Sequence, residues 1–159
     1  MERIDATNAC AIAATKGRRK FRGRNLRWES LIGPFDAREF QVFPLTSSDE
    51  LREEGELMSH CVGRRYPRWC HVGAVRVFSI RNFGDRRVAT ASLYFDFDAH
   101  CWRIEQCKGY GNEEIYEKYI GSRGASRGVD PDGIVLVLLE LLARYQRAQE
   151  IHDDANQFL

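Results

Sequence analysis

The sequence predicts an α+β domain, in which a small antiparallel sheet packs against an N-terminal-side helix and a long C-terminal helix. The sheet is expected to be a meander of three to four strands, because several alternating apolar segments follow one another with only short turn-like stretches between them. An apolar stripe at helical spacing near the end of the chain predicts the long helix. With 159 residues, 43% of them hydrophobic, the chain has the length of one domain and can bury a core.

The predicted elements begin after residue 37. A strand is expected over residues 38–45, where Pro44 favours an edge or terminal position because proline donates no ladder hydrogen bond. A helix follows over residues 46–58, and Ser47 and Glu50 have the spacing of a capping box at its start. Three further strands are expected over residues 74–80, 88–95 and 102–107.

The last third of the chain is expected to be mainly helical. A weaker helix is predicted over residues 113–120, and a flexible loop with two arginines over residues 121–128. Asp130 then caps a helix that has Pro131 at its first position and runs to about residue 149. Its wide apolar stripe predicts burial across one face of the sheet and consists of Ile134, Leu138, Leu141, Leu142 and Tyr145.

Charge is distributed unevenly along the chain. The formal net charge is only +1, from 24 basic and 23 acidic residues, but residues 16–27 hold seven basic side chains and no acidic one. The remainder therefore carries 17 basic and 23 acidic residues. We divide the chain into a flexible basic arm, residues 1–27, and a single domain, residues 28–159. The basic residues of the arm are Lys16, Arg18, Arg19, Lys20, Arg22, Arg24 and Arg27.

This arm predicts a nucleic-acid partner, either DNA or RNA, or a nucleoprotein complex. Its arginines and lysines suit phosphate contacts, and Phe21 and Trp28 are available for base stacking. The alternative is an arm that stays solvated, or one that binds an acidic protein surface, including the negative body of this same chain.

Several classes of protein are disfavoured. The longest apolar run, residues 134–139, is far shorter than the roughly 20 residues of a membrane span. Acidic residues precede the first small-residue stretch and basic ones follow it, which is the reverse of a secretory signal. Five cysteines, an odd number, favour reduced thiols or a metal site over a disulfide framework. We therefore expect a cytoplasmic protein with no membrane partner.

Two histidine–cysteine pairs lie close together in the sequence. His60 and Cys61 are followed by Cys70 and His71, and a zinc ion held by Cys61, Cys70 and His71 is one hypothesis. The alternative is that the cysteines pack as small apolar residues, with no cofactor. A third hypothesis makes His60 and Cys61 catalytic, with Cys61 as nucleophile. His60, His71 and His100 are the possible bases, and His60 is a poor one for Cys61 because neighbouring helical residues point about 100° apart.

Polar residues also lie within or at the ends of the predicted central strands. Arg81 ends the first of them, Thr90 and Ser92 share one side of the second, and Gln106 ends the third. Asn112 follows in a glycine-rich turn. Taken alone, these positions are typical of ordinary polarity at the edge of a sheet.

Short motifs over about residues 47–115 resemble the PcfJ-like proteins, which are encoded on conjugative plasmids, phages and other bacterial mobile elements. The matching pieces are HCVG from His60, SIR ending at Arg81, AT ending at Thr90, and the spaced residues Gln106, Gly109 and Asn112. The resemblance implies that residues 28–159 are the family's shared domain, standing nearly alone. It also implies one ligand-binding site formed by His60, Arg81, Thr90, Gln106 and Asn112.

One departure from the family pattern bears on activity. The family commonly has Thr-x-Glu in the second central strand, and this chain has Ser92 in place of the glutamate. A serine cannot replace a carboxylate that acts as general acid or base at neutral pH. The departure therefore favours binding over catalysis.

The leading hypothesis is a mobile-element accessory protein that acts as a nucleic-acid-binding or nucleoprotein-binding module. The arm would hold nucleic acid, and the face with His60, Arg81 and Gln106 would take an anionic or nucleotide-like group. One alternative is an anti-CRISPR-like inhibitor of a host defence complex, whose acidic body imitates a phosphate backbone. The other is an enzyme centred on His60 and Cys61, either nucleic-acid-processing or similar to Cys–His transferases.

Overall fold

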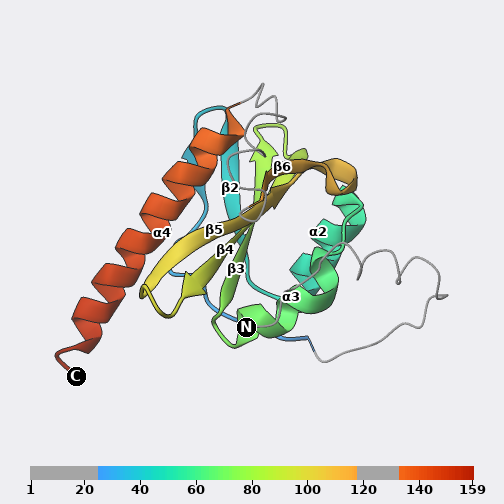
Figure 1. Ribbon diagram of the computed structural model, residues 1–159. Helices are drawn as coiled ribbons and strands as arrows, with labels where there is room; N and C mark the ends of the chain where they lie inside the picture. Colours follow the sequence, from blue (N-terminus) through green and yellow to red (C-terminus); the bar gives the residue numbers. More distant parts are fainter. Residues whose placement is uncertain (1–24, 118–132) are drawn as a thin grey trace.

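The computed structural model describes residues 25–117 and 133–159, and it confirms the α+β class. A six-stranded antiparallel sheet has helix α4 on one face and helices α2 and α3 on the other (Figure 1). The strands are β1 (Phe35–Ala37), β2 (Phe40–Leu45), β3 (Val75–Asn82), β4 (Arg87–Asp96), β5 (Cys101–Lys108) and β6 (Glu114–Glu117). The helices are α2 (Ser48–Met58), α3 (Val62–His71) and α4 (Ile134–Asn156), and a short 3-10 turn η1 spans Tyr110–Asn112.

The sheet is a meander in sequence order, as predicted, but it has six strands where the sequence predicted three to four. The additional strands, β1 and β6, have three and four residues and are too short to show a clear alternation. The prediction of a helix over residues 113–120 is wrong for the part that the structure describes, because residues 114–117 form a strand that pairs with β5. Pairing with a neighbouring strand overrides local propensity there.

Helix α3 was not expected either. It contains Gly63 and Pro67, two residues that disfavour a helix interior, and three arginines interrupt its apolar spacing. It forms because one side of it packs on the sheet and on α2, burying Val62, Tyr66 and Cys70. A β-carbon at Gly63 would lie only 2.9 Å from the Cα of Arg52, so the glycine permits the close approach of α3 to α2.

Helix α4 crosses the other face of the sheet, as the apolar stripe predicted. Its central tyrosine, Tyr145, is fully buried and makes edge-to-face contacts with Phe78 and Trp102, at ring-centroid distances of 5.6 and 4.9 Å. The helix runs to Asn156, beyond the predicted end, and the predicted start at Asp130 and Pro131 lies outside the described residues. No helix within the described ranges is long and apolar enough to cross a membrane.

Three irregularities in strand pairing decide which side chains face α2 and α3. Val88 is an extra residue between the pairs Ile80–Ala89 and Arg81–Arg87, and Glu105 is an extra residue between Ser92–Gln106 and Leu93–Ile104. A third shift lies between Cys107 and Lys108. Such bulges turn the following side chains to the other face of a sheet. As a result, Arg87 and Thr90 lie on the same face of the sheet, the one covered by α2 and α3, although strict alternation would place them on opposite faces.

The α4 layer offers a matched test of the core. We expect Leu138→Ala to lower the free energy of unfolding by about 2–5 kcal/mol, because Leu138 is fully buried against the sheet. Leu136 is 47% exposed on the same helix, so Leu136→Ala should change it by no more than about 0.5 kcal/mol. Chemical denaturation measures both, and equal losses in the two variants would contradict the packing of α4 described above.

Candidate functional site

A pocket of about 130 Å³ lies where the start of α3 meets the middle of β4, the end of β5 and the start of β6. Its lining joins the turn between α2 and α3, the first half of α3 and the sheet, and it mixes apolar and polar side chains. The polar and ionisable residues of the lining are His60, Cys61, Tyr66, Thr90, Ser92, Gln106, Lys108, Asn112 and Glu114. The pocket thus combines one histidine, one cysteine, amides, hydroxyls and both signs of charge.

The end of helix α2 positions His60. Ser59 adopts a left-handed conformation with φ 52° and ψ 49°, and the backbone N–H of His60 donates to the Gly55 carbonyl at 3.0 Å. The His60 carbonyl folds back so closely that a β-carbon at Gly55 would lie 2.9 Å from it. This turn points the imidazole at β4, where its Nε2 lies 2.7 Å from the Thr90 hydroxyl.

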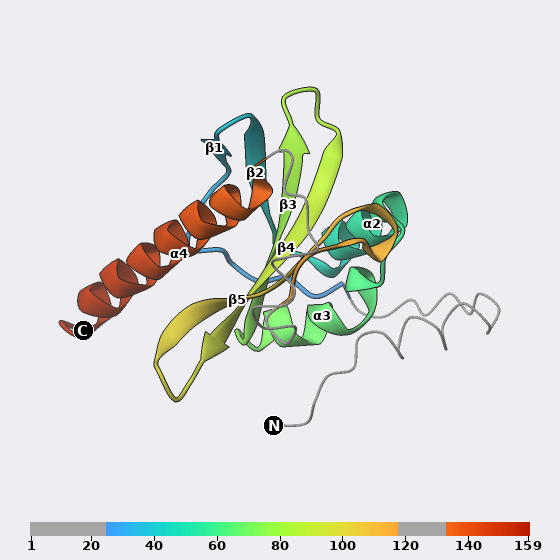
Figure 2. The ribbon, with the colours of Figure 1, turned by 45° about the horizontal axis from the view of Figure 1, so that its top comes forward.

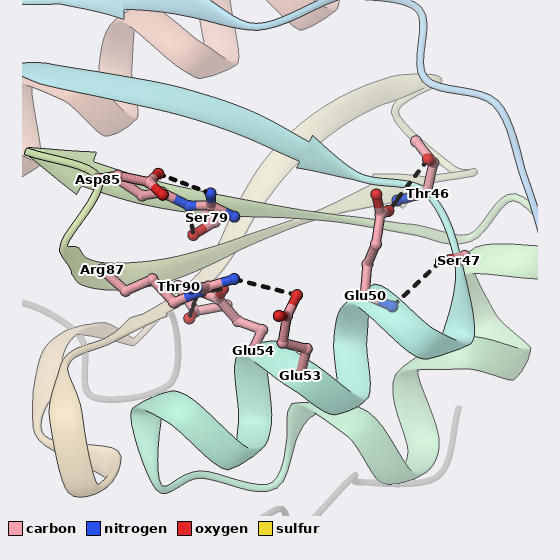
Figure 3. Close-up of polar contacts among 10 residues, drawn as sticks. Thr46, Ser47, Glu50, Glu53, Glu54, Ser79, Asp85, Arg87 and Thr90 are labelled. Carbon is pink, nitrogen blue, oxygen red and sulfur yellow. Dashed lines mark hydrogen bonds and ion pairs between the residues drawn. The ribbon is translucent and has the colours of Figure 1, made fainter. Parts of the chain in front are cut away.

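A buried carboxylate, Glu54, accepts a hydrogen bond from Thr90 and so orients it. Glu54 has no exposed surface, and its two oxygens accept hydrogen bonds of 2.7 Å, one from the Thr90 hydroxyl and one from Nε of Arg87 (Figure 3). Arg87 also contacts the exposed Glu53 at 3.4 Å. The bulge at Val88 brings Arg87 to this face, so the ion pair and the bulge depend on each other.

These contacts assign the proton on His60. The hydroxyl of Thr90 has one hydrogen, which goes to the Glu54 carboxylate, so the oxygen of Thr90 accepts from His60 Nε2–H. His60 Nδ1 then carries a lone pair, and it is buried with no hydrogen-bond partner among the described residues. Burial lowers the pKa of His60 below its ordinary value of 6.5, against the opposing influence of Glu54. The imidazole is therefore neutral near pH 7.

A second network lies beside the first and contains another carboxylate. Glu105, the extra residue in β5, accepts hydrogen bonds from Ser92 Oγ at 2.9 Å and from the Tyr66 hydroxyl at 3.3 Å. Burial, and next the carboxylate of Glu105, raise the pKa of Tyr66 well above its usual value, so Tyr66 stays a donor. Gln106 in turn donates from Nε2 to the Tyr66 hydroxyl. The carboxylate that the resemblance expects at position 92 is absent, but Glu105 places one in contact with Ser92.

The pocket brings together four of the five residues that the resemblance placed in one site. His60, Thr90, Gln106 and Asn112 all line it. Arg81 does not line it. Arg81 shares the sheet face but donates to Ser79 Oγ at 3.0 Å, pairs with Asp85 at 3.1 Å and lies over the Phe43 ring. The cation of this pocket is Lys108.

The described residues do not bring the two histidine–cysteine pairs together as a zinc site. Cys61 lines the pocket, whereas Cys70 is buried in the core under α3 and His71 is exposed. Burial raises the pKa of Cys70 to about 12, so this thiol does not readily form the thiolate that zinc requires. Within residues 25–117 and 133–159, no group of three or more His, Cys, Asp or Glu side chains is arranged to hold a metal ion.

Sequence reasoning missed the groups that orient the site. The burial of Glu54 could have been predicted from the sequence, because Glu54 lies three residues after Leu51 and four before Met58, on the apolar stripe of α2. A carboxylate on a buried stripe requires a partner. Arg87 and Glu105 had no such signal, because only the bulges place them on this face.

The basic arm lies almost entirely outside the described residues, which begin at residue 25. Lys16, Arg18, Arg19, Lys20, Arg22 and Arg24 fall in the part that is not described. Arg27 is exposed, and its backbone pairs with Ser47 in an isolated bridge.

Comparison with known proteins gives one match. The family model described as PcfJ-like protein matches residues 13–120, which is more than half of the chain and includes every residue of α2, α3 and β1 to β6. Neither the search of curated proteins nor the search of solved structures returned a match.

The buried ion pair provides a stability prediction with an adjacent control. We expect Glu54→Gln to lower the free energy of unfolding by about 3–5 kcal/mol, because Arg87 would keep a largely buried charge without its carboxylate. Glu53 contacts the same arginine but is 63% exposed, so Glu53→Gln should cost less than about 1 kcal/mol. Urea denaturation of the two variants tests this, and similar losses would show that the Glu54–Arg87 pair is not the stabilising one.

The state of His60 predicts a pH dependence. A pKa below 6.5 in the folded chain means that the unfolded chain binds more protons near that pH. The contribution of His60 to stability is therefore complete above pH 6.5 and is lost as the pH falls through the folded pKa. The free energy of unfolding of His60→Gln should fall less than that of the native chain over this range. An NMR titration of His60 with a midpoint above 6.5 would contradict the neutral imidazole.

Proposed function

The chain belongs to the PcfJ-like proteins, and from that premise we propose that it is a nucleic-acid-binding module of a mobile element. The observation that carries the proposal is the cluster of seven basic and no acidic residues at positions 16–27, attached to a body in which acidic residues outnumber basic ones. Such a segment binds a polyanion by neutralising phosphates and releasing condensed counterions. The net-negative remainder would restrict these contacts to the arm and to cationic patches on the domain.

The pocket would supply recognition beyond charge. Its volume of about 130 Å³ is smaller than the roughly 300–1,000 Å³ that encloses a whole drug-sized ligand, so it would admit one group of a larger molecule. Lys108, which pairs with Glu114 at 3.3 Å, provides a cation there, and Gln106 and Asn112 provide amides. That combination suits a nucleotide-like group, which carries anionic, donor and acceptor atoms together.

The structure shows how the arm should be tested. The backbone of Leu26 exchanges hydrogen bonds with Ser48, and the N–H of Trp28 donates to the Thr46 carbonyl, so deletion through residue 27 would disturb the domain. Substitution keeps the chain intact. The variant we choose carries Arg18→Gln, Arg19→Gln, Lys20→Gln and Arg22→Gln.

We expect this arm variant to bind DNA and RNA more weakly, with a shallower dependence on salt. Losing four phosphate contacts should reduce the slope of log affinity against log salt by about 2.8–3.6, at roughly 0.7–0.9 per contact. The control removes four exposed cations from the body, with Arg86, Arg103, Arg144 and Arg147 changed to Gln. Salt-titrated fluorescence anisotropy measures both, and an equal loss in the control would refute a special role for the arm.

The contribution of the pocket to nucleic-acid binding is tested by a substitution that changes no charge. Gln106→Leu keeps the volume and removes the amide, so affinity should fall about five-fold, the loss expected for one hydrogen bond, with no change in the salt slope. Gln41→Leu is the control, because Gln41 is also half-buried on the sheet but lies outside the pocket. Unchanged affinity in both variants would exclude the pocket from nucleic-acid binding.

A second candidate function is an enzyme that acts on the group entering the pocket. A specific observation favours it: His60 is neutral and is linked through Thr90 to the buried Glu54, an arrangement that orients an imidazole for proton transfer. Loss of turnover of labelled DNA or RNA in His60→Ala, with binding retained, would support this function. The inhibitor of a host defence complex stays a prediction.

A further inference from the structure

Helix α3 has two sharply different sides. Its inner side, with Val62, Tyr66 and Cys70, is buried against the sheet and α2. Its outer side contains no acidic residue and exposes Arg64, Arg65, Arg68 and His71. We call these four residues the α3 basic face. Arg64 and Arg65 are neighbours, Arg68 lies four and three positions after them, and His71 lies three positions after Arg68, so all four project from one broad side of the helix.

The three arginines of this face have no partner among the described residues: no hydrogen bond or ion pair of their side chains is formed there. Pairing varies among the other exposed arginines: Arg52, Arg103 and Arg144 form ion pairs with carboxylates, whereas Arg86 and Arg147 form none among the described residues. What distinguishes α3 is that three such arginines lie together on one helix. Like charges at helical spacing destabilise a helix. The chain keeps three such charges together, with no carboxylate to offset them.

The α3 basic face adjoins the base of the basic arm. His71, at the last position of α3, has Nδ1 3.2 Å from the carbonyl oxygen of Arg27, the last basic residue of the arm. The views in Figures 1 and 2 both show the chain from residue 25 passing next to α3. The cationic segment of the sequence therefore reaches the domain at the one described helix that exposes only basic charge.

We propose that the α3 basic face is a phosphate-binding surface that extends the nucleic-acid contacts of the arm onto the folded domain. The proposal rests on the proposed function, and it names the nucleic-acid backbone as the occupant. Unpaired guanidinium groups on one helix face match a row of phosphates, which arginine binds with two parallel hydrogen bonds.

The same helix would connect this surface to the pocket. Val62 and Tyr66, on the inner side of α3, line the pocket, while Arg65 and Arg68 lie on its outer side. A backbone held along α3 would therefore pass within one helix diameter of the pocket, about 10–12 Å. The arm would supply affinity, and the α3 basic face would fix where the strand lies relative to His60.

The test uses two pairs of arginines with the same spacing. Arg65→Gln/Arg68→Gln removes two charges three residues apart on α3, and Arg144→Gln/Arg147→Gln removes two with the same spacing on α4, across the sheet. Salt-titrated anisotropy with single-stranded and duplex DNA and with RNA is run on the full chain. The α3 variant should reduce the salt slope by about 1.4 on single strands and about 1.8 on duplex DNA, and the α4 variant should not change it.

The outcomes separate this inference from the proposed function. A slope that falls in the arm variant but not in Arg65→Gln/Arg68→Gln would overturn the inference and leave nucleic-acid binding intact. A native chain that binds no nucleic acid would overturn both. If the α3 variant instead abolished binding to an acidic protein while nucleic-acid binding was unchanged, the nucleic-acid backbone would not be the occupant of the α3 basic face. Circular dichroism and thermal melting confirm that each double variant is folded.

Discussion

The contact on which the rest of the site depends is the ion pair between Glu54 and Arg87, two groups that belong to different layers of the molecule. Glu54 comes from a helix and is fully buried, and Arg87 is the first residue of the bulged strand β4. An unpaired carboxylate could not remain in that position, so the pair fixes how α2 sits on β4. Thr90 uses the second oxygen of the same carboxylate, and His60 is held through Thr90.

Strand irregularity makes this arrangement possible. In a regular ladder Arg87 would face α4, and Glu105 would share a side with neither Gln106 nor Ser92. Two bulges bring Arg87 and Glu105 to the face covered by α2 and α3. There Arg87 pairs with Glu54, which holds Thr90 and through it His60, and Glu105 contacts Ser92 and Tyr66. Polar groups therefore gather on the face covered by α2 and α3, beside an apolar cluster, while the face covered by α4 is apolar.

The chemistry of the pocket bears on the choice between binding and catalysis. Ser92 in place of a glutamate weakened the case for an enzyme, because a hydroxyl does not titrate near neutral pH. Glu105 returns a carboxylate to contact with that serine from a different strand. His60 is neutral, and the nitrogen that carries its lone pair, Nδ1, is buried without a hydrogen-bond partner among the described residues. The basic arm and the α3 basic face address only how an anionic polymer would be held nearby.

The sequence by itself determined the features that depend on neighbouring residues. The meander order, the Ser47 cap of α2 and the apolar stripe of α4 all follow from local periodicity and turn residues, and the structure confirms them. The ordered motifs from His60 to Asn112 determined the family and named four residues that line one pocket. Tertiary structure alone decided that α3 is a helix, that residues 114–117 form a strand, and that Arg81 stays away from the pocket. It also placed Arg87 and Glu105, because a single extra residue in a strand reverses which face a side chain takes, and only pairing with the neighbouring strand reveals it.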